Sequence, residues 1–323
     1  MKKVLLASTV LAMTATVAAA DVTVSGSARM GVAYNSEAVN KLGFTSRVRV
    51  AFGLSGETDT GLAFGASIRA DNSGAGNNGV ARATPAPGTG SGDVNGAGNQ
   101  AAGSVFVSGA FGKLSMGDVD GAAELVTGDL AGVGLTGLGD LNESAFLSNT
   151  DAVRRSAARY EYSTGGLTFA VSADNPQNDA AALENVYSIG VKYSVDAYAF
   201  GLGYETSDVN GVSVDHIIAS GEATFSGITL KAVYGEADDF GGIAGNDFTQ
   251  YGISAKYSMD ALSVTAFHRV AETGVRKDKF TGIGASYALG GGASVVGGLV
   301  DVNYGLGGPV DQTRADLGLS FSF

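Results

Sequence analysis

The sequence predicts an all-β protein, a transmembrane up-and-down antiparallel β-barrel of about 16 strands. Three observations support this prediction. Apolar and polar residues alternate along most of the chain, as at its end, where Leu317, Leu319, Phe321 and Phe323 occupy every second position. Short turns alternate with long polar loops. Aromatic residues gather near the ends of the expected strands, where a membrane-spanning barrel carries its aromatic girdles.

The first segment of the chain has the pattern of a cleavable secretory signal. Residues 1–20 combine two lysines, a short apolar stretch and a final run of alanines, so cleavage is expected before Asp21. No charge run or Pro/Ser-rich linker divides the remainder. We therefore expect residues 21–323 to form one domain outside the cytoplasm.

Composition narrows the possible classes of partner and site. Without the two signal-peptide lysines, 18 basic residues stand against 32 acidic ones, a net charge of −14. A chain this acidic is a poor nucleic-acid binder. With no cysteine in the sequence, neither a disulfide framework nor a thiolate metal site can form.

Alternation defines the expected strands one by one. In 22–34, alternation puts the valines, Met30 and Tyr34 on one face of the strand. In 44–54 it puts Phe44 and Val48 on the apolar face, and in 62–70 it puts Phe64 and Ile68 there. The pattern predicts further strands over 104–111, 113–118, 154–162, 166–173, 186–195, 197–205, 213–225, 227–235, 249–258, 261–270, 280–289, 293–300 and 314–323.

The connections between these strands fall into two classes. Short turns are expected at 55–61, 110–113, 163–166, 194–197, 226–227, 258–261 and 289–292. Longer polar loops are expected at 71–103, 119–153, 174–185, 237–248, 271–279 and 301–313. Short turns on one side and long loops on the other describe a meander that crosses a slab, with both termini on the short-turn side.

The chemistry of the two strand faces favours lipid over water as the outer medium. The apolar face is a run of Val, Leu, Ile, Phe and Tyr, whereas the other face is mostly Ser, Thr, Gly and Arg. A barrel of about 16 strands has a lumen too wide for side chains to fill, so water enters it. The polar face then lines water and the apolar face meets lipid; a soluble all-β secreted protein is the alternative.

Several stretches resemble the general diffusion porins of the outer membrane of alphaproteobacteria, the Rhodobacter type. They are 25–35, 46–70, 105–118, 284–298 and 315–321. The resemblance implies a barrel of about 16 strands, usually a homotrimer, whose long third loop folds into the lumen. The terminal Phe323 is similar to the signal by which the barrel-assembly machinery reads outer-membrane proteins.

The resemblance also implies a pore constriction in which a basic wall faces an acidic loop. Arg29, Arg47, Arg49 and Arg69 lie on the matching early strands, and alternation alone gives all four a lumen-facing position. The acidic candidates on the third loop are Asp118, Asp120, Glu124 and Asp129. Solvated wall charges and ordinary loop acids are the alternative interpretation of these residues.

These observations predict a water-filled channel for passive diffusion of small hydrophilic solutes and ions in the outer membrane of a Gram-negative bacterium. A substrate-selective channel for sugars or anions and a plugged barrel acting as an adhesin are the alternatives. No enzyme is expected: the two histidines are His216 and His268, and nothing near His268 on its outward face reads as the Asn or Asp that would orient it in a hydrolase.

The remaining partners follow from this setting. No cofactor is expected, although the loop pair Asp238 and Asp239 could hold a weak calcium ion with loop carbonyls. Outer-membrane lipid and lipopolysaccharide are expected around the barrel. The low-complexity composition of loop 71–103 is typical of a disordered surface loop, and the resemblance implies a second role in which this loop latches onto a neighbouring subunit.

Overall fold

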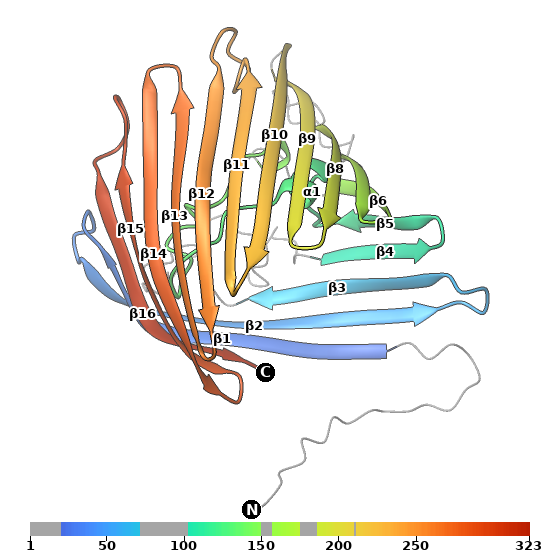
Figure 1. Cartoon of the computed structure of the whole chain (residues 1–323), viewed down its shortest axis with the longest axis horizontal. Helices are drawn as coiled ribbons and strands as arrows, with labels where there is room; N and C mark the ends of the chain where they lie inside the picture. The colour runs from blue at the N-terminus through green and yellow to red at the C-terminus, as the bar shows by residue number, and fades with distance from the viewer. Residues whose placement is uncertain (1–20, 72–102, 150–156, 175–185, 210) are drawn as a thin grey trace, which may run out of the picture.

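The computed structural model describes residues 21–71, 103–149, 157–174, 186–209 and 211–323. Within these residues, 16 strands close into one antiparallel barrel in which each strand pairs with its neighbours in the chain. Figure 1 shows the strands following one another around the ring. The predicted fold class is therefore confirmed. The expected signal peptide, 1–20, and the greater part of loop 71–103 lie outside the described residues.

The elements have the following bounds. The strands are β1 Asp21–Asn35, β2 Leu42–Glu57, β3 Ala63–Asp71, β4 Gly103–Gly109, β5 Gly112–Gly117, β6 Ala157–Thr164, β7 Leu167–Ala173, β8 Tyr187–Val195, β9 Tyr198–Val209, β10 Val212–Phe225, β11 Ile228–Asp238, β12 Phe248–Met259, β13 Leu262–Thr273, β14 Arg276–Gly290, β15 Ala293–Asn303 and β16 Gln312–Ser322. Two short helices, α1 Ala122–Thr127 and η1 Leu147–Asn149, lie between β5 and β6. Among the described residues no helix is both long and apolar enough to cross a membrane.

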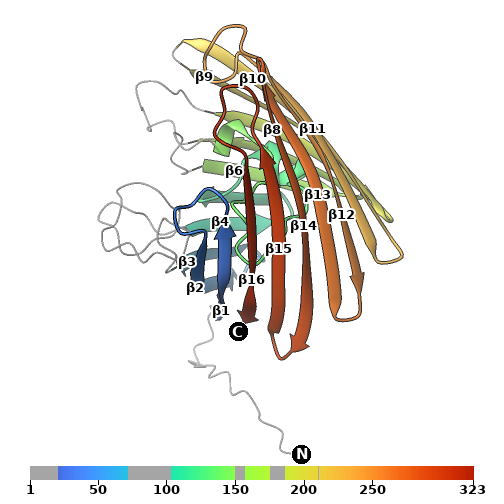
Figure 2. The same cartoon turned by 90° about the vertical axis from the view of Figure 1, so that its left-hand side faces the viewer.

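The first and last strands pair with each other and close the barrel. Their register runs from Ser27 opposite Ser322 to Asn35 opposite Arg314. At the end of the chain, the Phe323 N–H donates to the Gly26 carbonyl at 2.9 Å, and the Gly26 N–H donates to the Phe323 carbonyl at 3.3 Å. Figure 2 shows the end of β16 beside the start of β1, at the end of the barrel with the short turns. The closed ladder pairs the backbone polar groups that hydrocarbon cannot satisfy.

One expected loop is a tight turn instead. The sequence predicts a long connection at 271–279, but β13 continues to Thr273 and β14 begins at Arg276. Glu272 lies directly opposite Lys277 in the register, and the two form an ion pair. The strands therefore continue beyond the apolar band on charged cross-strand pairs, which a prediction based on apolar alternation cannot detect.

The outward face of the barrel has the composition expected of a surface that meets lipid. Large apolar side chains are exposed there, including Phe44 at 81% and Ile253 at 54%. Tyrosines mark both edges of this surface: Tyr187 and Tyr193 lie six residues apart on β8, and β9 and β12 repeat this spacing. Six residues of strand extend over roughly 20 Å, which suits an apolar band about 25 Å tall.

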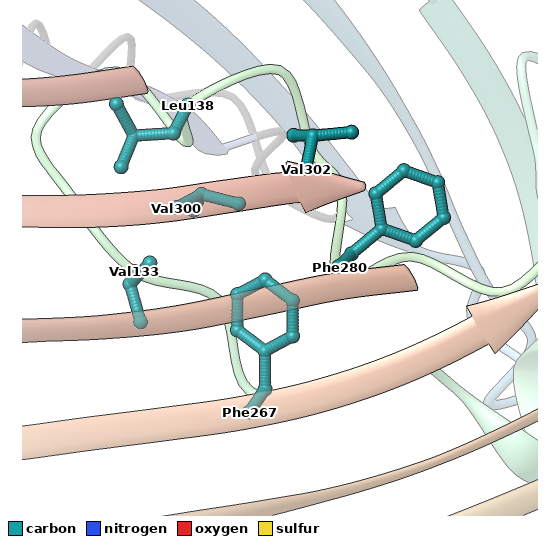
Figure 3. Close-up of a cluster of buried hydrophobic side chains, with 6 residues drawn as sticks. All are labelled: Val133, Leu138, Phe267, Phe280, Val300 and Val302. Carbon is teal, nitrogen blue, oxygen red and sulfur yellow. The ribbon is translucent and has the colours of Figure 1, made fainter. Parts of the chain in front are cut away.

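The buried apolar side chains lie between the barrel wall and the segment that joins β5 to β6. Figure 3 shows the largest of these clusters, in which Val133 and Leu138 from that segment pack on four wall side chains. Those four are Phe267, Phe280, Val300 and Val302. The inner face, predicted to be mostly polar, therefore also carries an apolar patch, which the segment inside the barrel covers.

Candidate functional site

The candidate site is the inner loop, which we define as residues 118–149, together with the wall it faces. The inner loop contains α1 and η1, and Figure 1 shows α1 and the segment after it within the ring of strands. The buried side chains of α1 are Ala122, Ala123, Val126 and Thr127, and the helix contacts β7 to β10. The connection between β5 and β6 therefore lies within the ring of strands, as the family resemblance implies for the long third loop.

A track of glycines on the inner wall makes room for this loop. A Cβ atom on Gly203 would lie 2.5 Å from the Ala123 Cβ, and one on Gly252 would lie 2.5 Å from the Leu130 Cδ1. Such distances are too short for real Cβ atoms, so a side chain at either position would displace the loop. Among the described residues, eight glycines meet the inner loop in this way: Gly31, Gly190, Gly201, Gly203, Gly252, Gly284, Gly298 and Gly318.

Serine hydroxyls hold the beginning of α1. The Ala122 N–H donates to the Ser172 hydroxyl on β7, and the Ala123 N–H donates to the Ser188 hydroxyl on β8, both at 2.8 Å. The first N–H groups of a helix have no partner within the helix. The barrel wall thus supplies the acceptors that α1 lacks, which fixes both the position and the direction of the helix.

A buried carboxylate holds the middle of the inner loop. Asp316 on β16 is 7% exposed and accepts hydrogen bonds from the Leu135 N–H at 2.8 Å and from the Thr136 N–H and hydroxyl at 2.6 and 2.7 Å. Arg314 of the same strand donates to the Leu138 carbonyl at 3.2 Å. Hydrogen bonds to charged groups each contribute about 1.5–3 kcal/mol, so these contacts hold the loop strongly.

The four predicted arginines share the inner face of β1 to β3. Arg29 and Arg47 lie directly opposite each other in the register, and Arg49 follows two residues after Arg47. Arg69 lies opposite Ala51, which has the same parity as Arg47 and Arg49. Arg29 is 8% exposed and donates to the Leu135 carbonyl at 3.3 Å, so it also contacts the inner loop.

Three of the predicted acids lie in the first part of the inner loop. The Asp118 N–H donates to the Gly103 carbonyl, and the Asp120 carbonyl accepts a hydrogen bond from Arg159 on β6 at 2.8 Å. Glu124 is half-buried and is not among the α1 side chains buried against the wall. Whether these acids and the arginines form opposite walls of a constriction stays a prediction.

The fourth acid, Asp129, has a structural contact within the loop. Its Oδ1 accepts a hydrogen bond from the Ser144 N–H at 2.8 Å, which ties the two halves of the loop together. Burial raises the pKa of Asp129, although the Ser144 amide and the positive charges of Lys231 and Arg269 act in the opposite direction. Lys231 lies on β11 and Arg269 on β13, away from the arginines of β1 to β3.

Sequence reasoning missed several basic residues of the inner wall. Arg159, Arg314, Lys231 and Arg269 contact the inner loop or lie near its charges. Their parity within each strand is the signal that could have identified them, because each shares a face with neighbours that point into the lumen. The prediction relied instead on stretches that resemble the porin family, and these four residues lie outside such stretches.

The weak calcium site at Asp238 and Asp239 stays a prediction, because it would combine two carboxylates with loop carbonyls. Among the described residues, no group of three or more His, Asp or Glu side chains could hold a metal ion. The Asp239 carboxylate accepts a hydrogen bond from the Gly245 N–H at 2.6 Å within its own loop. His268 is exposed on the outer face and contacts the Thr281 hydroxyl at 2.8 Å.

Comparisons with known proteins agree with this architecture. A family model described as Gram-negative porin matches residues 7–305. A porin of Rhodobacter capsulatus is 34% identical over 329 residues, which cover 94% of this chain and 100% of the relative. A solved porin structure refined at 1.8 Å superposes with a TM-score of 0.75 at 30% identity, covering 94% of this chain and all of that one. A variant of the Rh. blastica porin superposes with a TM-score of 0.67 at 23% identity over the same shares, a likeness of fold.

Proposed function

Because this chain belongs to the family of Gram-negative porins, we propose that its inner loop and the arginines of β1 to β3 determine which solutes pass through it. The protein is an outer-membrane channel through which small hydrophilic solutes and ions diffuse passively. Because the members of this family are channels, the geometry and the charge of the passage determine which solutes the protein admits.

The observation that carries the proposal is the asymmetric placement of the inner loop. Glycines and hydrogen-bonding side chains hold the loop against β7 to β16 and β1, while Arg47, Arg49 and Arg69 share the inner face of β2 and β3. The loop narrows the passage, and it carries Asp120 and Glu124 on a different wall from these arginines. A passage with cations on one side and carboxylates on the other has a transverse electric field.

Such a field selects without binding tightly. Polar solutes that align their dipoles with the field pass more easily than apolar solutes of the same size, because the water in a narrow passage is partly ordered. The size limit is determined by the loop, and the ion preference by the balance between the two charged walls.

Ion selectivity in planar lipid bilayers tests the proposal. The triple variant Arg47→Ser, Arg49→Ser, Arg69→Ser removes three positive charges but keeps Arg29, which also holds the loop. We expect its reversal potential in a salt gradient to shift towards cation preference. Lys279→Ser is the control, since Lys279 is exposed and has the outward parity of Lys277. Equal reversal potentials in the triple variant and the wild type would contradict the proposal.

We further propose that the protein assembles as a homotrimer through the side of the barrel formed by β3 to β7. These strands are short: β5 has 6 residues and β7 has 7, whereas β14 has 15. At about 3.4 Å per residue, β5 extends over only about 20 Å and does not cover an apolar band by itself. Contacts with neighbouring subunits would cover the side of the barrel on which these strands are short. Chemical cross-linking in detergent should then give a trimer; a monomer alone would refute this assembly.

A sugar- or anion-selective channel is the second candidate. The same bilayer recordings distinguish this candidate from a general diffusion channel, because in a substrate-selective channel one solute should block the ion current in a saturable way. Lipopolysaccharide, weak calcium binding and recognition of Phe323 by the assembly machinery remain predictions.

A further inference from the structure

A buried polar cluster lies where the second half of the inner loop meets the wall. His216 on β10 is 2% exposed, and Glu205 on β9 and Gln250 on β12 are both 0% exposed. His216 lies between the other two: its Nδ1 is 3.0 Å from Glu205 Oε2, and its Nε2 is 3.3 Å from Gln250 Nε2. The Phe146 ring of the inner loop packs edge-on against the imidazole at 6.2 Å.

Contacts with the loop backbone fix the orientation of the Gln250 amide. The Ala145 N–H donates to Gln250 Oε1 at 2.8 Å, and Gln250 Nε2 donates to the Ala145 carbonyl at 2.7 Å. An N–H can only donate and a carbonyl can only accept, so the reversed amide would lose both bonds. Gln250 therefore presents an N–H to His216.

This orientation fixes the protonation state of the imidazole in the structure. Because Gln250 donates, His216 Nε2 must accept, and the imidazole is neutral with its hydrogen on Nδ1. The Nδ1–H then donates to Glu205. The carboxylate of Glu205 also accepts from the Leu147 N–H at 2.7 Å and the Ser148 hydroxyl at 2.9 Å, so it holds two donors of the inner loop as well as His216.

We propose that His216, Glu205 and Gln250 form a proton-sensitive latch that positions residues 145–148 of the inner loop and so controls the aperture of the pore. Glu205 and Gln250 bind the loop, whereas His216 is a positioning residue that aligns both. The proposal rests on the proposed function, since it assigns a pH response to the same passage.

Protonation of His216 is incompatible with the latched arrangement. A second hydrogen, on Nε2, would point at the amide donor of Gln250, and two donors in contact repel. Rotating the Gln250 amide would relieve this contact but would sacrifice both hydrogen bonds to Ala145. In either case the wall loses part of its hold on the loop. Since the barrel lies behind residues 145–148, the released segment can move only into the lumen, which should reduce conductance at acid pH.

The charged surroundings of the latch are limited. Among the described residues, Glu205 from β9 is the charged group that contacts His216 directly. Arg269 from β13 lies on the far side of Gln250, with its guanidinium 3.5 Å from Gln250 Oε1. On β11 the facing residues are Gly235 and Ala237, and loop residues 145–148 carry no charge. Histidine is the residue type that works as a proton switch near neutral pH, and His216 is the histidine of this cluster.

Only two histidines occur in the sequence, which gives the test its control. We would measure single-channel conductance between about pH 8 and 5 for the wild type, His216→Gln and His268→Gln. The latch predicts a fall in conductance towards acid pH in the wild type and in His268→Gln, and loss of this fall in His216→Gln. A pH-dependent fall that persists in His216→Gln, or its absence in the wild type, would overturn the latch.

A second measurement does not require a change at His216. In the His268→Gln protein, His216 is the single histidine, so nitrogen-15 NMR of labelled histidine reports its tautomer and its titration directly. We expect the Nδ1–H tautomer at neutral pH and a titration midpoint that coincides with that of the conductance. Different midpoints would refute the latch even if His216→Gln failed to fold. Channels that conduct at neutral pH but lack the pH response would refute the latch alone, whereas no channel at any pH would refute the proposed function.

Discussion

Replacing Gly203 with alanine tests whether the glycine track positions the inner loop. The new Cβ would lie 2.5 Å from the Ala123 Cβ and 2.7 Å from its Cα. Ordinary contact begins at 3.4 Å, so 3.4 − 2.5 gives a retreat of roughly 0.9 Å by α1. The wall cannot yield instead, because β9 is paired on both sides within the barrel.

The cost of this retreat follows from the contacts that hold α1. A shift of about 1 Å would lengthen the 2.8 Å bonds to Ser172 and Ser188 beyond hydrogen-bonding distance. Losing these two bonds costs about 1 kcal/mol each. Overpacking adds about 1–3 kcal/mol. A total of roughly 3–5 kcal/mol raises the fraction of undocked loop by a factor of roughly 10² to 4 × 10³, at 1.4 kcal/mol per tenfold change.

Thiol labelling measures that fraction, because the chain has no cysteine of its own. Val126→Cys places a probe at a position that is 2% exposed when the loop is docked. Adding Gly203→Ala should increase its rate of reaction with a methanethiosulfonate reagent by the factor above. The control is Gly221→Ala on β10, whose nearest contacts are with the Phe200 ring at 3.8 and 4.0 Å. Equal labelling rates with and without Gly203→Ala would refute the role of the glycine track.

Three further predictions follow from the contacts of the inner loop and the chain end. Asp316→Asn keeps one oxygen acceptor but loses the negative charge and the oxygen that accepts from the Thr136 N–H and hydroxyl. The inner loop is then held less firmly, so the noise of the single-channel conductance should increase. Noise equal to that of the wild type would contradict this prediction. Because burial raises the pKa of Asp129, the folded loop binds the proton more tightly than the unfolded chain, and loop stability falls as pH rises from 3.8 through the raised value. Asp129→Asn should abolish that fall in loop stability. The measurement is the urea concentration at the midpoint of the change in tryptophan fluorescence, followed against pH in a Phe146→Trp background. If the midpoint of Asp129→Asn still fell with rising pH, Asp129 would not be the group responsible. Deleting Phe323 removes two backbone hydrogen bonds to Gly26 and should lower the yield of folded barrel, seen as heat-modifiable migration on gels, whereas an unchanged yield would show that the chain end is dispensable.

The strands could be predicted because each one carries its own signal. Alternation along 186–195 or 249–258 reports which side chains meet lipid, and this depends only on neighbours within the same strand. The prediction failed where polarity replaced alternation, as between Glu272 and Lys277, since the ladder continues there without an apolar face.

The candidate site could be predicted only in part. Parity alone indicated the inward position of Arg47 and Arg49, because position within a strand is a local property. The contact of Asp129 with Ser144 could not be derived, because it depends on how the loop folds back on itself. Likewise, nothing local to Asp316 indicates that it binds loop residues 180 and 181 positions away in the chain.

The sequence by itself determined the barrel, its strand number and the face that each strand turns towards lipid, because a period of two is written into every strand. The path of the inner loop, the apolar patch beneath it and the buried position of His216 between Glu205 and Gln250 were decided by the tertiary structure. The physical reason is that alternation indicates which side of the barrel wall a residue occupies, whereas the burial of an inward-facing residue depends on which segment covers that residue. That cover comes from a distant segment of the chain, whose docking is fixed by glycine gaps and hydrogen bonds that exist only once the barrel has closed.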